Sequence, residues 1–473
     1  MNTSNDTIKQ KIDSWFEENT DNMLRDLEKL IAIRSVKGPA LEGAPYGEKS
    51  HEALTTAASL LEEKGFAVRN FQDIMIESDL GPKPPILGIL AHLDIVEEGG
   101  GWETDPYKMT IKNGAIYGRG VIDNKGPAIA AMYAMCCARE LCPDLKKGAR
   151  LILGSGEETG FEDVTEYIRK NDLPPNVFSP DANFPVVNTE KGRFTPVFGA
   201  KWEKDGTLPR IVSIIGGKTV NIVPNSASAV IEGVSLGDAK EFCKNYSEKT
   251  GAQITVIAEN DKLIITADGT ATHASTPQMG NNAQTALIEM LASMPFAGSK
   301  GFGYLKSLSR LFSHGDYYGK ALGIEMSDEI SGELTVNFGV LNFTEYEFSG
   351  NFDSRTPACA DTVDIVGITT EAMEAEGITI KKTTISTCHH TPADSQFVQT
   401  LLRIYEDHTG NAPECLITGG QTYVHDITGG VVFGCGFPGI DYRAHGANEF
   451  FKVDELVMSA KMFTQVIVDM CAK

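Results

Sequence analysis

The segment PPILGILAHLDIV, residues 84–96, decides the fold. It is a short apolar run, and the turn residues EEGGGWETDP (97–106) follow it directly. Such runs are typical of strands buried inside an α/β sheet. His92 and Asp94 stand two positions apart near its end, so on a strand their side chains point to the same side. The segment therefore predicts a buried strand that ends in a polar group.

Helices and strands are expected to alternate on both sides of this segment, as they do in α/β proteins. The apolar residues upstream recur every three or four positions, which predicts amphipathic helices. Asn113-Gly114 predicts a type I′ hairpin turn within TIKNGAIYGRG. The expected elements are helices at about 12–33, 50–63, 126–141 and 161–171, strands at 66–71, 84–96 and 149–154, and a hairpin at 110–120.

The pattern changes at about residue 191. Alternating strands such as FTPVFGAKWEK and KLIITADGTATH are interleaved with helical stretches near 238–249 and 283–293, an α+β texture that continues to about residue 384. From residue 393 a helix and short apolar strands return. We therefore expect an α/β fold whose mixed sheet is flanked by helices. It would comprise residues 1–193 and 385–473, interrupted by an inserted α+β domain at 194–384.

Composition excludes several classes of function. The chain has 473 residues with 42 Lys and Arg against 64 Asp and Glu, a net charge of −22. This charge repels phosphate backbones and anionic lipids, so we expect neither nucleic acid nor membrane as a partner. No apolar stretch reaches signal-peptide or transmembrane length, which predicts a cytoplasmic protein. The nine cysteines show no CxxC spacing and are expected to be reduced.

Several loops carry side chains that could hold cations. Besides His92, the donors are Asp123 in GRGVIDNKGP, the Glu157-Glu158 pair in GSGEETG, Asp181 in SPDANFP and His445 in RAHGANE. Imidazole and carboxylate donors suit two zinc-like ions held close together. Taken singly, each has a simpler reading as a helix cap, an exposed turn or a core histidine. Spacing alone does not bring residues so far apart in the chain together.

A family resemblance joins these motifs. In order, HLDIVEEGGGW, GRGVIDNKGP, GSGEETG, SPDANFP, NTEKG, ATHASTPQMGNNA, GGQTYVH and RAHGANE resemble the motifs of the dinuclear-metal aminoacylase and carboxypeptidase superfamily. The match is closest to its dipeptidase V-like, Xaa-His dipeptidase branch. The resemblance extends from about residue 92 to the carboxyl end. It implies a catalytic domain built from the first and last segments, with the insert as a lid.

The resemblance also implies the metal ligands. Asp123 would bridge two divalent ions, with His92 and Asp181 on one and Glu158 and His445 on the other. Zinc is the favoured metal, and manganese and cobalt are alternatives. The peptide bond that follows Asp123 is cis in similar proteins.

The remaining roles follow from the same resemblance. Glu157 would be the general base that activates a water, and Asp94 would orient His92. His273 would donate a hydrogen bond to the scissile carbonyl oxygen. Asn221 and Arg355 would hold the substrate carboxylate, which favours peptides with a free carboxyl end.

The implied function is that of a monomeric, metal-dependent dipeptidase acting on short unblocked peptides. Two alternatives stay open at this point. One is an N-acyl amino acid amidohydrolase with the same metals, and the other is a catalytically silent peptide-binding protein of the same fold.

Two departures from the family pattern matter. Asn124 stands where many relatives have Asp, a change expected to be tolerated because this side chain is not a ligand. His425 stands where relatives carry Arg, so a guanidinium is replaced by a titratable imidazole. The side-chain preference of the enzyme is therefore left open by the sequence.

Overall fold

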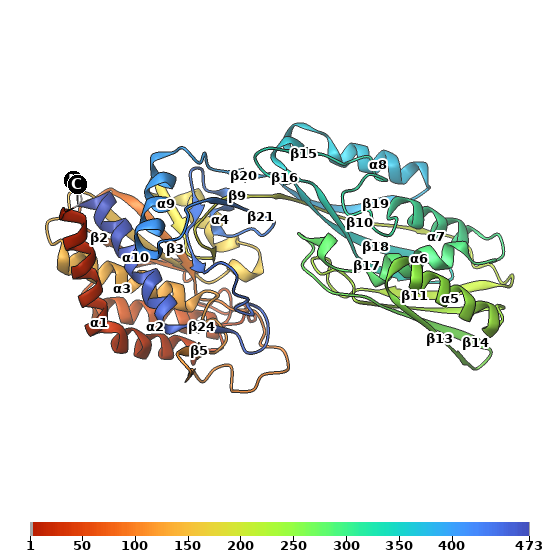
Figure 1. Cartoon of the computed structure of the whole chain (residues 1–473), viewed down its shortest axis with the longest axis horizontal. Coiled ribbons are helices and arrows are strands. Elements are labelled where there is room, and N and C mark those ends of the chain that lie inside the picture. Colours follow the sequence, from red (N-terminus) through yellow and green to blue (C-terminus); the bar gives the residue numbers. More distant parts are fainter. Residues whose placement is uncertain (1–2, 473) are drawn as a thin grey trace. The chain divides into compact units, whose positions relative to one another are not determined.

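The computed structural model describes residues 3–472, and the chain divides into two compact units (Figure 1). Unit 1 comprises Met1–Asn188, His390–Ile417 and Gln421–Lys473, and unit 2 comprises Thr189–His389 and Thr418–Gly420. These boundaries differ by five residues from the expected ones (188 against 193, and 389 against 384). The reason is that β10 (Gly192–Lys201) and β19 (Thr379–Ser386) pair with each other within unit 2, so the expected boundaries would cut both strands.

A mixed sheet forms the centre of unit 1. Its strand order is β1-β2-β6-β3-β7-β22-β9-β20, with β21 beside β9. The quoted segment 84–96 contains β3, which runs parallel to both of its neighbours, β6 and β7. The bounds are β1 Val68–Phe71, β2 Met75–Leu80, β3 Pro85–His92, β6 Gly148–Gly154, β7 Asn176–Ser179, β9 Val186–Glu190, β20 His389–His390, β21 Cys415–Thr418 and β22 Val431–Val432.

Helices cover both faces of this sheet. Leu87, Ile89 and Ala91 of β3 belong to one core with the buried residues of α1, α2, α3, α9 and α10, whereas Leu90 packs with α4 on the opposite face. This alternation is expected of a strand buried on both sides. The bounds are α1 Thr3–Ile31, α2 Glu48–Glu63, α3 Lys125–Leu141, α4 Glu162–Lys170, α9 Gln396–Thr409 and α10 Val453–Cys471.

Short elements complete unit 1. The predicted hairpin is present as β4 (Thr110–Lys112) and β5 (Ala115–Tyr117), with Asn113 and Gly114 at φ values of 54° and 76°. Both φ values are positive, as a type I′ turn requires. Strand β24 (Phe450–Lys452) pairs with β5, and β8 (Ala182–Asn183) pairs with β23 (Cys435–Gly436).

Unit 2 is α+β, as expected. Its antiparallel sheet has the order β13-β14-β12-β11-β17-β18-β10-β19. Alternate residues of β12 are buried in one core with residues of the helices, so helices cover one face of the sheet. The bounds are β11 Arg210–Gly216, β12 Ser226–Glu232, β13 Gln253–Glu259, β14 Lys262–Asp268, β17 Thr335–Phe343, β18 Glu347–Thr356, α5 Leu236–Thr250, α6 Ala283–Ser293, α7 Lys300–Leu311 and α8 Ile365–Ala375.

Two expectations about the chain as a whole can be compared with the structure. All nine cysteines are free thiols. No helix within residues 3–472 is long and apolar enough to cross a membrane.

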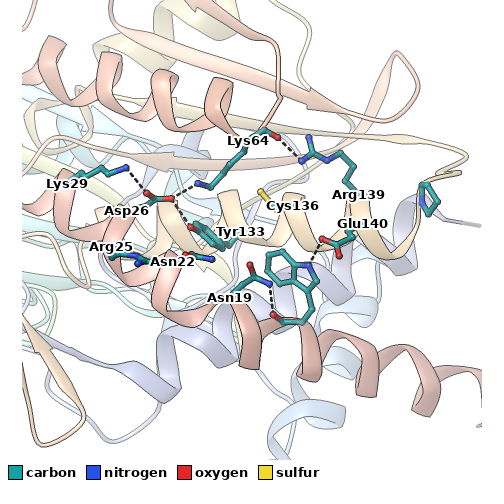
Figure 2. A pocket seen from close by; sticks show the side chains of 12 residues that line it. Asn19, Asn22, Arg25, Asp26, Lys29, Lys64, Tyr133, Cys136, Arg139 and Glu140 are labelled. Atoms are coloured by element: carbon teal, nitrogen blue, oxygen red, sulfur yellow. Dashed lines mark hydrogen bonds and ion pairs between the residues drawn. The ribbon is translucent and has the colours of Figure 1, made fainter.

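A cavity of about 770 Å³ lies between α1, the end of α2 and the second half of α3 (Figure 2). Two of its charged side chains, Lys29 and Lys64, contact Asp26, which is only 7% exposed. The Asp26 carboxylate accepts hydrogen bonds from Lys29 at 3.0 Å, from Tyr133 at 2.7 Å and from Lys64. Burial alone would raise the pKa of Asp26, but Lys64, Tyr133 and Lys29 outweigh it and lower the pKa. The cluster therefore joins three helical segments through one ionised carboxylate.

Replacing Asp26 by Asn should destabilise unit 1 by about 2 kcal/mol, because Lys64 and the half-exposed Lys29 lose their shared counter-charge. The measurement is the midpoint of urea denaturation, followed by tryptophan fluorescence, to which Trp15 in the same cavity contributes. Because the folded pKa of Asp26 is lowered, its contribution is present above the ordinary value of 3.8 and is lost as the pH falls below it. Exposed Glu28→Gln on the same helix is the control. An unchanged midpoint in Asp26→Asn would contradict this role.

Candidate metal centre

The expected metal ligands converge at one edge of the unit 1 sheet. Strands β6, β3 and β7 are parallel neighbours, so their carboxyl ends meet there. His92 is the last residue of β3, the short turn Glu157–Thr159 follows β6, and Asp181 follows β7. Asp123 precedes α3, and His445 comes from the loop between β23 and β24. His92, the Glu157-Glu158 pair and Asp181 thus meet because they lie at the same ends of adjacent parallel strands, whereas Asp123 and His445 come from other loops that pack against this edge.

The five predicted ligands form two groups of three that share Asp123. One group is His92, Asp123 and Asp181, and the other is Asp123, Glu158 and His445. In each group one donor atom from each residue lies within 4.8 Å of the others. His92 Nε2 is 3.1 Å from Asp123 Oδ1, and His445 Nε2 is 2.9 Å from Asp123 Oδ2. The two oxygens of one carboxylate therefore face the two histidines.

His92 has the orientation of a ligand. Its ring is fully buried, and Nδ1 lies 3.0 Å from the backbone oxygen of Asp94, to which it can donate its proton. In that tautomer Nε2 carries the lone pair, and this buried atom has no hydrogen-bond partner among the described residues. Buried polar atoms normally have partners, so an unpaired imidazole nitrogen facing two carboxylates fits a cation.

The charges of the cluster point to the same conclusion. Burial, then Asp181, raises the pKa of Glu157 well above its ordinary range. Burial and the neighbouring Asp123 raise the pKa of Glu158 to about 7. His445, bonded to Asp123 and Glu158, has a pKa raised to about 11. Carboxylates held this close repel one another, and bound cations would relieve the repulsion.

Asp94 contacts the backbone of the Glu157-Glu158 turn as well as His92. Its Oδ1 lies 3.4 Å from His92 Nδ1, and its carboxylate accepts the backbone N–H of Glu157 at 3.3 Å and of Glu158 at 3.0 Å. Asp94 is 1% exposed. It therefore fixes both the end of β3 and the turn that follows β6.

The sequence analysis did not identify Asp163, a second buried carboxylate that, like Asp94, binds backbone N–H groups of the segment after β6. Asp163 is fully buried, and its Oδ2 accepts the backbone N–H groups of Ser155 and Gly156, both at 2.8 Å. The hydroxyl of Tyr423 donates to the same oxygen. Tyr423 lies in the quoted GGQTYVH motif, which was the available signal for this contact, whereas nothing in the sequence around Asp163 indicated it.

The side chain of Asn124 contacts a predicted ligand. Its Nδ2 donates to Asp181 Oδ1 at 2.8 Å and to the backbone oxygen of Pro180 at 2.9 Å. That Asn124 is not itself a ligand stays a prediction. Its amide orients Asp181 by donating a hydrogen bond, which an ionised Asp at this position could not do. The peptide bond between Asp123 and Asn124 is cis, as the resemblance implied.

The other predicted site residues lie in unit 2. His273 is exposed, and its Nδ1 lies 2.7 Å from Ser275 Oγ and accepts the backbone N–H of Ser275 at 3.2 Å. In the neutral ring the proton is then on Nε2, which makes that nitrogen a hydrogen-bond donor. Asn221 is exposed, and its backbone oxygen accepts the N–H of Ala274. The contacts of His273 and Asn221 with substrate stay predictions.

Arg355 is less accessible than expected for a residue that binds a substrate carboxylate. It is 4% exposed, and Nε and Nη2 donate to the carboxylate of Asp353 at 2.6 and 3.1 Å. Nη1 donates to the backbone oxygen of Gly419. A substrate carboxylate would have to share this guanidinium with Asp353, and the predicted role of Arg355 is untested.

His425 is buried, with 8% of its surface exposed. Its Nε2 lies 3.2 Å from Gln421 Nε2, which can donate to it. The Gln421 side chain therefore contacts His425 at a position where the family resemblance leads us to expect Arg. Its effect on specificity is an open prediction.

A strand-edge group of imidazoles and carboxylates on an α/β unit fits a metal-dependent hydrolase. The comparisons with known proteins agree with this class. The model of peptidase family M20/M25/M40 matches residues 88–469. The chain belongs to this family and is a metallopeptidase.

Two curated relatives align over almost the whole chain. YtjP of Bacillus subtilis (strain 168), whose name assigns it provisionally to the dipeptidases, is 34% identical over 457 residues, covering 95% of this chain and 97% of the relative. The Beta-Ala-Xaa dipeptidase of Lactobacillus delbrueckii subsp. lactis is 32% identical over 463 residues, covering 96% and 97%.

Solved structures share the fold at low sequence identity. The dipeptidase Dug1p of Saccharomyces cerevisiae has a TM-score of 0.57 at 16% identity, with 99% of each chain covered. The M20 family metallo-carboxypeptidase Sso-CP2 of Sulfolobus solfataricus has a TM-score of 0.59 at 14% identity, covering 94% of this chain and 98% of the other. These likenesses establish the arrangement of elements.

Proposed function

We propose that the chain is a dipeptidase that hydrolyses short unblocked peptides with two divalent metal ions. The observation that carries the proposal is the pair of donor groups that share Asp123, with Glu157 beside them. Glu157 belongs with His92 and Glu158 to a further group of close donor atoms. The names of the two curated relatives support a dipeptide substrate.

His92, Asp123 and Asp181 would hold one ion, and Asp123, Glu158 and His445 would hold the other. The donor set contains imidazole and carboxylate groups without a thiolate, which suits zinc, manganese or cobalt. Zinc is our first choice. Bound there, the ions would supply Lewis acidity and a water of lowered pKa.

Glu157 then has the role of general base. Its pKa is raised by burial and by the nearby carboxylates, so it favours the protonated state without cations. Cations would lower that pKa toward neutrality, the range in which a carboxylate both takes a proton from water and returns it to the leaving amine. Asp94 keeps Glu157 in place through the backbone bond at 3.3 Å.

A substrate panel tests this function. We expect protein reconstituted with zinc, manganese or cobalt to hydrolyse unblocked dipeptides and to leave N-acetyl amino acids almost untouched. Preference for N-acetyl amino acids would make the enzyme an acyl amino acid amidohydrolase. Binding of two metals without turnover of any dipeptide would contradict the proposal and favour a silent binding protein. Cytoplasmic location and a monomeric state stay predictions.

A further inference from the structure

A buried ion pair lies behind the metal centre in unit 1. Arg119 Nη1 and Glu449 Oε2 are 2.6 Å apart, and their side chains are 1% and 0% exposed. Burying two charges costs free energy unless both are fully hydrogen-bonded. Neither residue belongs to the groups of potential ligands. The burial of these two charges therefore has to be explained by something other than metal coordination.

The carboxylate of Glu449 also accepts hydrogen bonds from backbone N–H groups, mostly through Oε1. The Gly120 N–H lies 3.1 Å from both carboxylate oxygens, the Ile122 N–H lies 3.0 Å from Oε1, and the Asp123 N–H lies 3.3 Å from Oε1. One carboxylate thus binds three amides of the turn that ends at Asp123. Gly120 has a φ of 88°, a left-handed conformation that glycine adopts readily.

The partner, Arg119, extends these contacts to the segment after β3. Its Nη2 lies 3.4 Å from the backbone oxygens of both Glu97 and Glu98. The guanidinium carbon is 5.3 Å from the ring centre of Trp102. The Arg119–Glu449 pair therefore links the Asp123 turn with the loop that follows His92 and Asp94.

Glu449 is also on the segment that carries His445. Its backbone oxygen accepts the N–H of Gly118 at 3.2 Å, and the next residue, Phe450, pairs with Tyr117. Glu449 and Asp123 are 326 positions apart in the chain. Glu449 thus connects the turn that contains Asp123 with the loop that contains His445. The facing atoms of those two predicted ligands, Asp123 Oδ2 and His445 Nε2, are 2.9 Å apart.

We propose that Glu449 is a positioning residue that sets the geometry of the two-metal centre by holding the Asp123 turn against the His445 loop. The inference rests on the proposed function. Residues that orient ligands typically contribute about 10- to 100-fold to metal affinity or activity. Glu449 would do so through backbone amides, without touching the metals or the substrate.

The test is Glu449→Gln. Its amide keeps one oxygen acceptor but presents an N–H₂ group to Arg119 and to the backbone N–H groups. We expect metal affinity, measured by competition with a chelating dye, to fall about 10- to 100-fold. The absorption spectrum of the cobalt-loaded protein should also change. Should this variant not fold, Glu449→Asp keeps the charge on a shorter side chain and should also weaken metal binding.

Glu455→Gln is the matched control. Glu455 lies on α10 near the same loop and binds Tyr442 and Lys452, each at 2.8 Å, but none of the amides at 120–123. We expect this variant to keep wild-type metal affinity. Wild-type metal affinity and an unchanged cobalt spectrum in both Glu449 variants would overturn the proposal, even if they unfold more easily. Wild-type protein that binds no metal would instead contradict the proposed function.

Discussion

Glu157→Gln should lower kcat for dipeptide hydrolysis by about 10²- to 10⁴-fold, the usual contribution of a general base. The two donor groups that share Asp123 do not include Glu157, so the variant should keep both metals. The amide has nearly the same shape as the carboxyl but cannot take a proton from water. The measurements are steady-state kinetics with a saturating dipeptide and the metal content by mass spectrometry.

A matched control separates loss of the base from loss of local charge. Glu162 lies at the start of α4, shortly after the same turn, and its side chain is 71% exposed beside Lys37. Glu162→Gln should leave kcat and metal content unchanged. Full activity in Glu157→Gln would remove this residue from the role of base. Loss of metal in that variant would assign Glu157 to the ligands.

Removal of the metals should abolish activity and destabilise unit 1. Four carboxylates, Asp123, Glu157, Glu158 and Asp181, lie around the two histidines. Burial, the largest influence, and the charge of Asp123 both raise the pKa of Asp181, although His92 opposes them. Cations compensate this repulsion, and ligands that bind only the folded state stabilise it by mass action.

Dialysis against a chelator, followed by activity and thermal unfolding measurements, tests this expectation. Activity should fall to the background and return when zinc, manganese or cobalt is added. The unfolding temperature should fall and recover in parallel. Calcium is a suitable control, because it prefers a larger set of oxygen ligands than this site offers. Undiminished hydrolysis by demonstrably metal-free protein would contradict the two-metal mechanism.

Local elements were predictable because their signals are local. A helical stretch was predicted near 283–293, and α6 spans Ala283–Ser293. Asn113-Gly114 predicted its hairpin because few other residues adopt positive φ twice in succession. The buried strand at 84–96 was predicted from its apolar run, and β3 occupies Pro85–His92.

The candidate site depended on information that a local pattern does not contain. His92 and His445 meet at Asp123 because of strand order and loop packing, and only the resemblance to a family joined them beforehand. The contacts of Asp163 and Glu449 with backbone amides depend on tertiary packing and leave no periodic signal. Arg355 was expected to offer its guanidinium to a substrate, but its pairing with Asp353 is visible only in the folded strand.

The chain leaves unit 1 at β9 and returns to it at β20, which bears on how the length of unit 2 can change. The two strands are neighbours in the unit 1 sheet, and the Asn188 side chain donates to the Thr391 backbone oxygen at 2.8 Å. The long excursion of unit 2 therefore begins and ends at almost the same place. A change in the length of unit 2 would therefore leave the connectivity of the sheet edge with the predicted metal ligands unaltered.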